Sequence, residues 1–140
     1  MSSKKNKIKI PSPKEGKQIK APNIIEMEHL DYPIFCFKHV HKDHGLNCCT
    51  HDEQRALVDK LFQLSQMTWQ QIQSASRHGS GAEKIYRSSI KPKMPAFITG
   101  DVDYLLALRF DGRKPILVHR NRFIMHIIFI DNGFSVYNHG

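Results

Sequence analysis

The sequence predicts an α+β fold in which a short strand and two helices pack on a four-stranded antiparallel β-meander. Two observations support this prediction: two helix-start motifs lie between residues 50 and 76, and the last third of the chain holds β-rich runs separated by Asp-Gly and Asn-Gly. Helices that precede antiparallel strands are typical of the α+β class. The 140 residues fit one domain, which we place at residues 23–140 behind a basic arm, residues 1–22.

Two capping boxes mark the predicted helices. Residues 50–53, Thr-His-Asp-Glu, place a Thr N-cap three residues before a Glu. Apolar residues then recur at the spacing of one helical face as far as Leu64, which predicts a helix over 51–65. A second box at 68–71, Thr-Trp-Gln-Gln, predicts a shorter helix over 68–76.

The strands are predicted from β-branched and aromatic runs. Residues 32–40, YPIFCFKHV, predict a short strand. Residues 76–95 are rich in Gly, Pro and basic residues, which indicates a long surface connection with at most one short turn or strand near Ile85; such connections are often functional. Asp-Gly and Asn-Gly are strong hairpin signals. The four strands of the expected meander are 103–110, 114–120, 123–130 and 134–139.

Most of the net charge of +8 lies in the arm, because residues 1–22 hold seven Lys and one Glu. Their low apolar content predicts a disordered segment. Such a segment attracts nucleic acid or an acidic partner without reading a sequence, and the alternative is an arm that is only solvated.

The composition also bears on the compartment. No apolar run reaches the ~20 residues of a membrane span, and the Lys-rich start lacks the apolar region of a secretory signal. Three cysteines are an odd number, and two of them are adjacent. A disulfide framework is therefore not expected, and a reducing cytoplasm fits better.

Strand registers predict a cluster of titratable side chains. Two-residue loops at the turns set His126 opposite Leu117 on one side and opposite His139 on the other. Directly opposed residues share a face of the sheet. One face is then expected to carry Tyr104, His119, His126, Tyr137 and His139, and the other Arg109 and Arg120. A three-residue loop at 131–133 would instead move His139 to the other face, and the alternative for His126 alone is a core histidine.

This combination of side chains suits RNA cleavage by the 2′-hydroxyl, which needs a base, an acid and a cation but no metal. Imidazoles move protons near neutral pH, Tyr orients or donates, and Arg or Lys stabilises a pentavalent phosphate. We expect His126 and His139 to share the acid–base work while Tyr137 orients. The expected cations are Arg109, Arg120 or Arg87. Candidate phosphate-binding residues on the basic connection are Arg77, His78, Lys84, Arg87 and Lys91; the alternative is a merely solvated loop.

A small basic protein whose helices precede an antiparallel sheet ending in Tyr-Asn-His-Gly resembles the RelE/YoeB-type toxin superfamily. Tyr137 and His139 resemble the terminal feature of that family. Leu-Arg-Phe around Arg109 and Val-His-Arg around His119 and Arg120 resemble its strand-borne basic residues.

The resemblance covers residues 50–140, whereas the strand 32–40 and the long arm depart from the family. These toxins are ribonucleases of bacterial toxin–antitoxin pairs that usually cleave messenger RNA at the ribosome. The resemblance therefore implies a metal-independent endoribonuclease (an mRNA interferase) without a cofactor. Its substrate would be free or ribosome-bound mRNA, and its partner an antitoxin protein.

A second group of side chains leaves other functions open. Thiol and imidazole ligands at this density can bind zinc tetrahedrally, which would make the protein a nucleic-acid- or protein-binding module rather than an enzyme. A Cys activated by a neighbouring His is a further alternative, and ordinary buried Cys with surface His is the simplest. The residues concerned are Cys36, His39, His41, His44, Cys48, Cys49 and His51.

Overall fold

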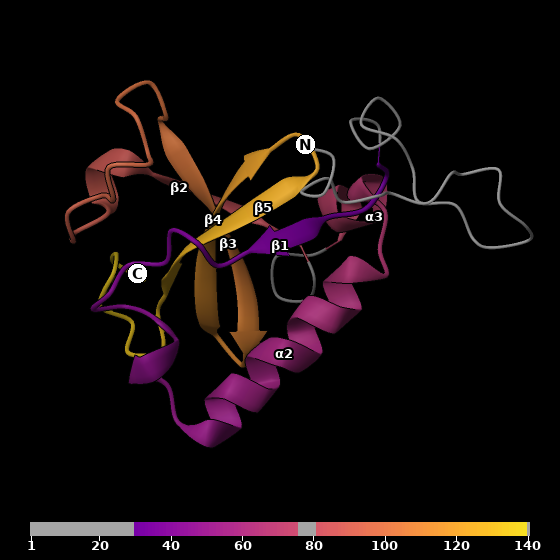
Figure 1. Cartoon of the computed structure of the whole chain (residues 1–140), viewed down its shortest axis with the longest axis horizontal. Coiled ribbons are helices and arrows are strands. Elements are labelled where there is room, and N and C mark those ends of the chain that lie inside the picture. Colours follow the sequence, from indigo (N-terminus) through magenta and orange to yellow (C-terminus); the bar gives the residue numbers. More distant parts are fainter. Residues whose placement is uncertain (1–29, 76–80, 140) are drawn as a thin grey trace, which may run out of the picture.

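The computed structural model describes residues 30–75 and 81–139, so the basic arm predicted at 1–22 lies outside the described residues. These described residues form one mixed five-stranded sheet with two α-helices (Figure 1), and the predicted α+β class is confirmed. None of the described helices has the length and apolarity that crossing a membrane requires. The elements are β1 (Ile34–Cys36), α2 (His51–Ser65), α3 (Trp69–Ser74), β2 (Glu83–Tyr86), β3 (Tyr104–Asp111), β4 (Lys114–Asn121) and β5 (Ile124–Ile130).

Both helices begin at the predicted capping boxes. The Thr50 side chain accepts a hydrogen bond from the Glu53 amide, and the Glu53 carboxylate accepts one from the Thr50 amide. Thr68 and Gln71 form the same reciprocal pair at α3. Each box satisfies backbone donors that a helix start leaves without intrahelical partners. This local chemistry explains why the sequence located both helices.

The strand order is β1-β5-β4-β3-β2, in which β2 to β5 are antiparallel and β1 runs parallel to β5. The predicted meander is therefore only partly formed. Its first three strands are present, but residues 134–139 form no strand and contribute only an isolated bridge between Tyr137 and Ile90. The fourth antiparallel strand is β2, the short strand expected near Ile85, and β1 covers the edge of β5 instead.

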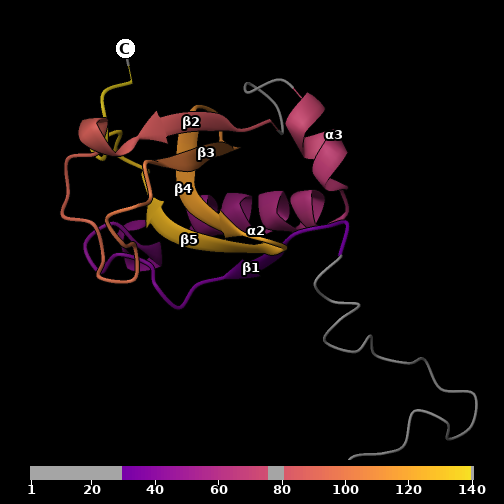
Figure 2. The same cartoon turned by 90° about the horizontal axis from the view of Figure 1, so that it is seen from above.

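The sheet carries a hydrophobic core on each face. On one face, Leu57 and Leu64 of α2 pack with strand residues such as Ile127. On the other, Ile98 of the β2–β3 connection and Val136 of the C-terminal segment pack over the sheet. Figure 2 shows the helices and this connection on different sides of the sheet. Covered faces on both sides explain why the central strands lack polar alternation.

The observed hairpins differ in register from simple two-residue loops at the predicted positions. In the β3–β4 hairpin the closing pair is Asp111 and Lys114, one residue later than predicted, with Gly112 at φ +60° in the loop. A bulge between Arg109 and Asp111 then shifts the register by one residue, and such a slip moves a strand's side chains to the opposite face. Leu106 consequently pairs with Val118, and Tyr104 lies on the helix-covered face rather than beside His119, which corrects the predicted cluster.

The turn of the β4–β5 hairpin also lies one residue later than predicted, which changes the pairing register by two and preserves the predicted faces. Its closing pair is Asn121 and Ile124, and a bulge follows between Leu117 and Val118. His119 therefore lies directly opposite His126. The prediction that these two histidines share a face is confirmed, although the residue opposite His126 was predicted to be Leu117.

Candidate active site

Three histidines converge on the sheet face that the helices leave uncovered. His119 and His126 project from neighbouring strands with ring centroids 6.4 Å apart. His39, which follows β1, brings its ring centroid to 5.8 Å from that of His126. These three side chains, together with Phe97, are called the imidazole cluster below.

Phe97 lies at the centre of the imidazole cluster. Its ring stacks on His39 with a centroid distance of 3.7 Å and an interplanar angle of 5°. It lies 4.7 Å from the His126 ring and 6.3 Å from the His119 ring. Phe97 itself is 36% exposed. An aromatic ring from the β2–β3 connection therefore shields the histidines while the cluster stays open to solvent at its rim.

The environment of His126 favours a neutral imidazole. Its Nδ1 atom is buried and has no hydrogen-bond partner in the described part of the chain. Burial lowers the pKa of His126 below its usual value of 6.5, and repulsion from His39 and His119 lowers it further. Burial and like charge both disfavour the protonated form. At neutral pH, His126 is therefore uncharged, and an uncharged imidazole is the form that can accept a proton from a substrate.

A carboxylate lies within electrostatic reach of His119. A hydrogen bond from the Thr99 hydroxyl is the main cause that lowers the pKa of Asp101, and the charges of Arg87 and His119 lower it further. Arg87 stabilises the loop of residues 99–102 that holds Asp101. Its Nη1 donates hydrogen bonds to the carbonyls of Thr99 at 2.7 Å and Val102 at 3.1 Å. Arg87 was predicted as a phosphate ligand; one of its amino groups is engaged by the loop.

A shallow groove of about 420 Å³ extends from His39 along the β2–β3 connection. Its charged and titratable lining residues are His39, His41, Lys42 and Lys93, and no acidic residue is among the described residues that line it. We call it the basic groove. Its positive potential suits a phosphate backbone.

Three further predicted catalytic residues, His139, Tyr137 and Arg109, lie at the far end of the β4–β5 pair. The Nε2 atom of His139 lies 2.9 Å from Oδ2 of Asp131, and the His139 ring stacks on Tyr137 at 3.9 Å. Arg109 also lies at this end, since it pairs with Pro115, whose carbonyl accepts the Asp131 amide.

This placement separates His139 from the imidazole cluster. His126 lies on β5, five residues before Asp131, which directly follows that strand; this is about 16 Å at the rise of an extended chain. The predicted opposition of His126 and His139 was therefore wrong, because residues 134–139 form no strand beside β5. The catalytic roles assigned to Tyr137, His139 and Arg109 stay predictions.

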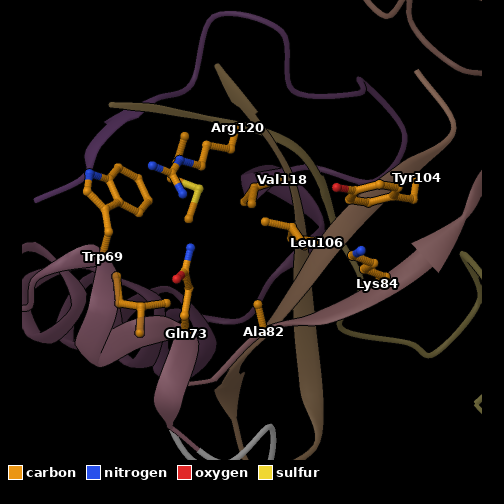
Figure 3. Close-up of a pocket in the computed structure, with 10 residues that line it drawn as sticks. Trp69, Gln73, Ala82, Lys84, Tyr104, Leu106, Val118 and Arg120 are labelled. Atoms are coloured by element: carbon orange, nitrogen blue, oxygen red, sulfur yellow. The ribbon is translucent and has the colours of Figure 1, made fainter. Parts of the chain in front are cut away.

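Arg120 lies on the helix-covered face, where its guanidinium stacks over the Trp69 ring at 3.5 Å. Lys84 lies on the same face, because it pairs with Leu106. Both line a pocket between α3 and the sheet (Figure 3). Lys91 is exposed beside the C-terminal segment, where its amide donates to the Val136 carbonyl. Arg77 and His78 lie outside the described residues.

The Cys and His residues that suggested zinc are dispersed. The Cys48 thiol donates to the Asp43 carbonyl and the Cys49 thiol to the Gly45 carbonyl. Cys36 pairs with His126 across β1 and β5, and His51 is exposed at the first position of α2. Within residues 30–75 and 81–139, no three His, Cys, Asp or Glu side chains are grouped to hold a metal ion.

Sequence reasoning missed the parts of the imidazole cluster that come from loops. His39 was grouped with the possible zinc ligands, and neither Phe97 nor Asp101 was singled out. Phe97 is an isolated aromatic residue in a polar connection rich in Pro and Lys. This isolation was the one signal in the sequence that could have indicated a role for Phe97, because the residue belongs to no periodic apolar pattern of a helix or strand.

Comparison with known proteins identifies no relative. No family model matches the chain, and neither a curated protein nor a solved structure matches it. The functional argument therefore depends on the geometry of the site.

Proposed function

We propose that the protein is a metal-independent endoribonuclease of the kind that the RelE-type resemblance implies, with the imidazole cluster as its active site. The observation that carries the proposal is the opposition of His119 to His126, whose neutral imidazole keeps a buried and unpartnered Nδ1. A pair of imidazoles on neighbouring strands offers both a proton acceptor and a proton donor.

The proposed reaction is an internal transesterification. His126 accepts the proton of a ribose 2′-hydroxyl, and the 2′-oxygen forms a bond to the adjacent phosphorus. The bond from phosphorus to the 5′-oxygen breaks, and protonated His119 donates its proton to that oxygen. The products are a 2′,3′-cyclic phosphate and a 5′-hydroxyl. The Asp101 carboxylate, whose pKa is lowered chiefly by the Thr99 hydroxyl and in part by the charge of His119, lies near the proposed acid.

The basic groove supports the binding of an RNA strand to this site. It begins at His39, a member of the imidazole cluster, and carries Lys42 and Lys93 away from it. Cations at this position neutralise phosphates on either side of the scissile bond and stabilise the extra charge of the pentavalent state. The Lys-rich segment at 1–22 adds positive charge to the same chain.

The biological setting is proposed from the resemblance and the composition. The substrate is mRNA, free or bound to the ribosome, and the partner is an antitoxin protein that blocks the site. The three cysteines, all free thiols, are consistent with a reducing cytoplasm.

The decisive experiment is cleavage of an end-labelled mRNA by purified protein in EDTA, both free and on stalled ribosomes. We expect cuts that leave 2′,3′-cyclic phosphates. Replacing a general base or acid typically costs about 10²–10⁴-fold in rate, so His126→Gln and His119→Gln should lose at least about 100-fold while remaining folded.

The matched control is His51→Gln, which changes an exposed histidine at the start of α2. Its cleavage rate should equal that of the unaltered protein. Wild-type rates in His126→Gln would overturn the assignment of the site. An absence of cuts in both formats at high enzyme concentration would leave a nucleic-acid- or protein-binding module as the better account.

A further inference from the structure

A second site lies on the opposite face of the sheet, between α3 and strands β2 to β5. It is a pocket of about 360 Å³, which falls in the range of small-ligand sites. Figure 3 shows Trp69, Gln73 and Arg120 toward one end and Lys84 and Tyr104 toward the other. Leu106 and Val118 lie between these ends. We call it the sheet pocket.

The cation at one end of the sheet pocket has no neutralising partner among the described residues. The Arg120 guanidinium stacks on Trp69, and its Nε donates to the Arg122 carbonyl at 2.8 Å. No carboxylate of the described residues pairs with Arg120. Burial lowers the pKa of Arg120. A partly buried cation without a counterion is costly, and a bound anion would remove that cost.

A second cation strengthens the positive potential of the sheet pocket. The Lys84 Nζ atom lies 4.8 Å from the centre of the Tyr104 ring, and this lysine is exposed. None of the described residues that line the pocket is acidic. Lys84 lies level with Val118 across the sheet, and Arg120 lies two residues further along β4, so the two residues are about 12 Å apart. A ligand longer than one phosphate can therefore contact both long side chains.

The walls between the cations are flat and apolar. Trp69 and Tyr104 present aromatic rings, and Leu106 and Val118 form the floor. Tyr104 is 37% exposed, so part of this residue is accessible to a ligand. The Gln73 amide adds one donor and one acceptor at the Arg120 end. Aromatic surfaces next to cations are the combination that binds a base together with its phosphate.

We propose that the sheet pocket binds a nucleoside 5′-phosphate unit, with the phosphate at Arg120 and the base over the apolar floor against Tyr104. Lys84 flanks the ligand and adds positive charge. The unit comes either from a free mononucleotide or from the 5′-phosphorylated end of a single-stranded RNA. Both sources present the same chemistry to the pocket.

This inference does not depend on the ribonuclease proposal. Arg120 and His119 are consecutive on β4 and therefore point to opposite faces of the sheet. Nucleotide binding can be measured without cleavage, and cleavage can be lost without altering the sheet pocket. His126→Gln should therefore retain nucleotide binding, which distinguishes failure of one proposal from failure of the other.

The test uses Trp69, which is the only tryptophan in the chain and lines the sheet pocket. Its fluorescence is followed while AMP, adenosine, inorganic phosphate or a 5′-phosphorylated single-stranded oligoribonucleotide is added to the full chain. We expect a saturable change with AMP, and at least tenfold weaker binding of adenosine and of phosphate alone. If the oligonucleotide binds more tightly than AMP, the natural ligand is an RNA end. If it binds equally or more weakly, the natural ligand is a free nucleotide.

Two variants and one control establish where AMP binds. Charge-assisted hydrogen bonds to phosphate are among the strongest polar contacts, so Arg120→Gln should weaken AMP binding about tenfold or more. Lys84→Gln changes an exposed residue and leaves the fold intact. It should weaken AMP binding by a smaller factor than Arg120→Gln does. Lys93→Gln, which alters the basic groove, should leave AMP binding to the sheet pocket unchanged.

Two results would overturn this proposal. The first is the absence of a saturable signal with both AMP and the oligonucleotide at millimolar concentration. The second is equal weakening by Lys93→Gln and Lys84→Gln, which would indicate unspecific attraction to a basic surface.

Discussion

His139 binds Asp131 and thereby closes the C-terminal segment onto the end of β5. The His139 Nε2 lies 2.9 Å from the Asp131 carboxylate, which also accepts the amides of Ser135 at 2.7 Å and Val136 at 3.1 Å. Asp131 is only 1% exposed. A buried carboxylate needs such donors. Because Asp131 binds groups of the segment that directly follows it, the chain turns away from the sheet there.

The Asp131→Ala variant should lose stability, because three donors would be left without their acceptor. Unsatisfied buried donors cost about 1–3 kcal/mol each before relaxation and hydration, so we expect a loss of about 2–4 kcal/mol. Urea unfolding at neutral pH measures it. Asp59→Ala, at an exposed position of α2, should change stability by less than about 0.5 kcal/mol. Equal effects of the two substitutions would contradict this role of Asp131.

Glu53 should make stability depend on pH in acid. Its carboxylate binds Lys114 at 2.7 Å, and this bond is the main cause that lowers the pKa of Glu53 from 4.5 to about 2. A lowered carboxyl pKa stabilises the folded state fully above the unfolded pKa of 4.5. That stabilisation is lost as the pH falls from 4.5 through about 2.

The Glu53→Gln variant isolates this effect. Hydrogen bonds to charged groups contribute about 1.5–3 kcal/mol, so the variant should be less stable than the unaltered protein by about 2 kcal/mol at pH 7. The difference should shrink between pH 4.5 and 2, as followed by urea unfolding across that range. A difference that stays constant with pH would show that the Glu53 charge does not contribute.

The helices were predictable because their signals are local. Each capping box joins residues three apart, and the periodic apolar face follows at once. The end of the sheet was not predictable in this way. Residues 134–139 include aromatic and β-branched residues typical of a strand. However, the Asp131 side chain accepts the amides of Ser135 and Val136, which strand pairing would need. The parallel pairing of β1 with β5 is also non-local.

The candidate site was predictable only in part, for the same reason. Both turns lie one residue later than predicted, which changes each register by two. His119 and His126 therefore keep a common face, whereas Tyr104 changed face because the bulge near Arg109 adds an odd shift. His39 and Phe97 reach the cluster from loops. Their positions depend on tertiary packing, which the hydrophobic periodicity of the sequence does not predict.

His126 should reduce stability in mildly acidic solution. Its folded-state pKa is lowered by burial and then by His39 and His119, whereas in the unfolded chain it binds a proton near pH 6.5. The unfolded state therefore gains more protons as the pH falls below 6.5, and stability declines. His126→Gln removes this group, so the stability of the unaltered protein relative to the variant should fall between pH 7.5 and 5.5 in thermal or urea unfolding. A relative stability that rises over this range would contradict the neutral imidazole.

Phe97 should control the protonation of His126. Its ring lies 4.7 Å from the His126 ring and excludes water from it, and burial is the largest cause of the lowered pKa of His126. Phe97→Ala should therefore raise that pKa toward 6.5, as measured by NMR titration of the His126 ring. His119→Gln should also raise it, but by less, because repulsion from His119 is the smallest of the three causes. Phe134→Ala, which alters an aromatic neighbour of His139, should leave it unchanged. A larger shift in His119→Gln than in Phe97→Ala would make charge repulsion, rather than burial, the reason why His126 stays neutral.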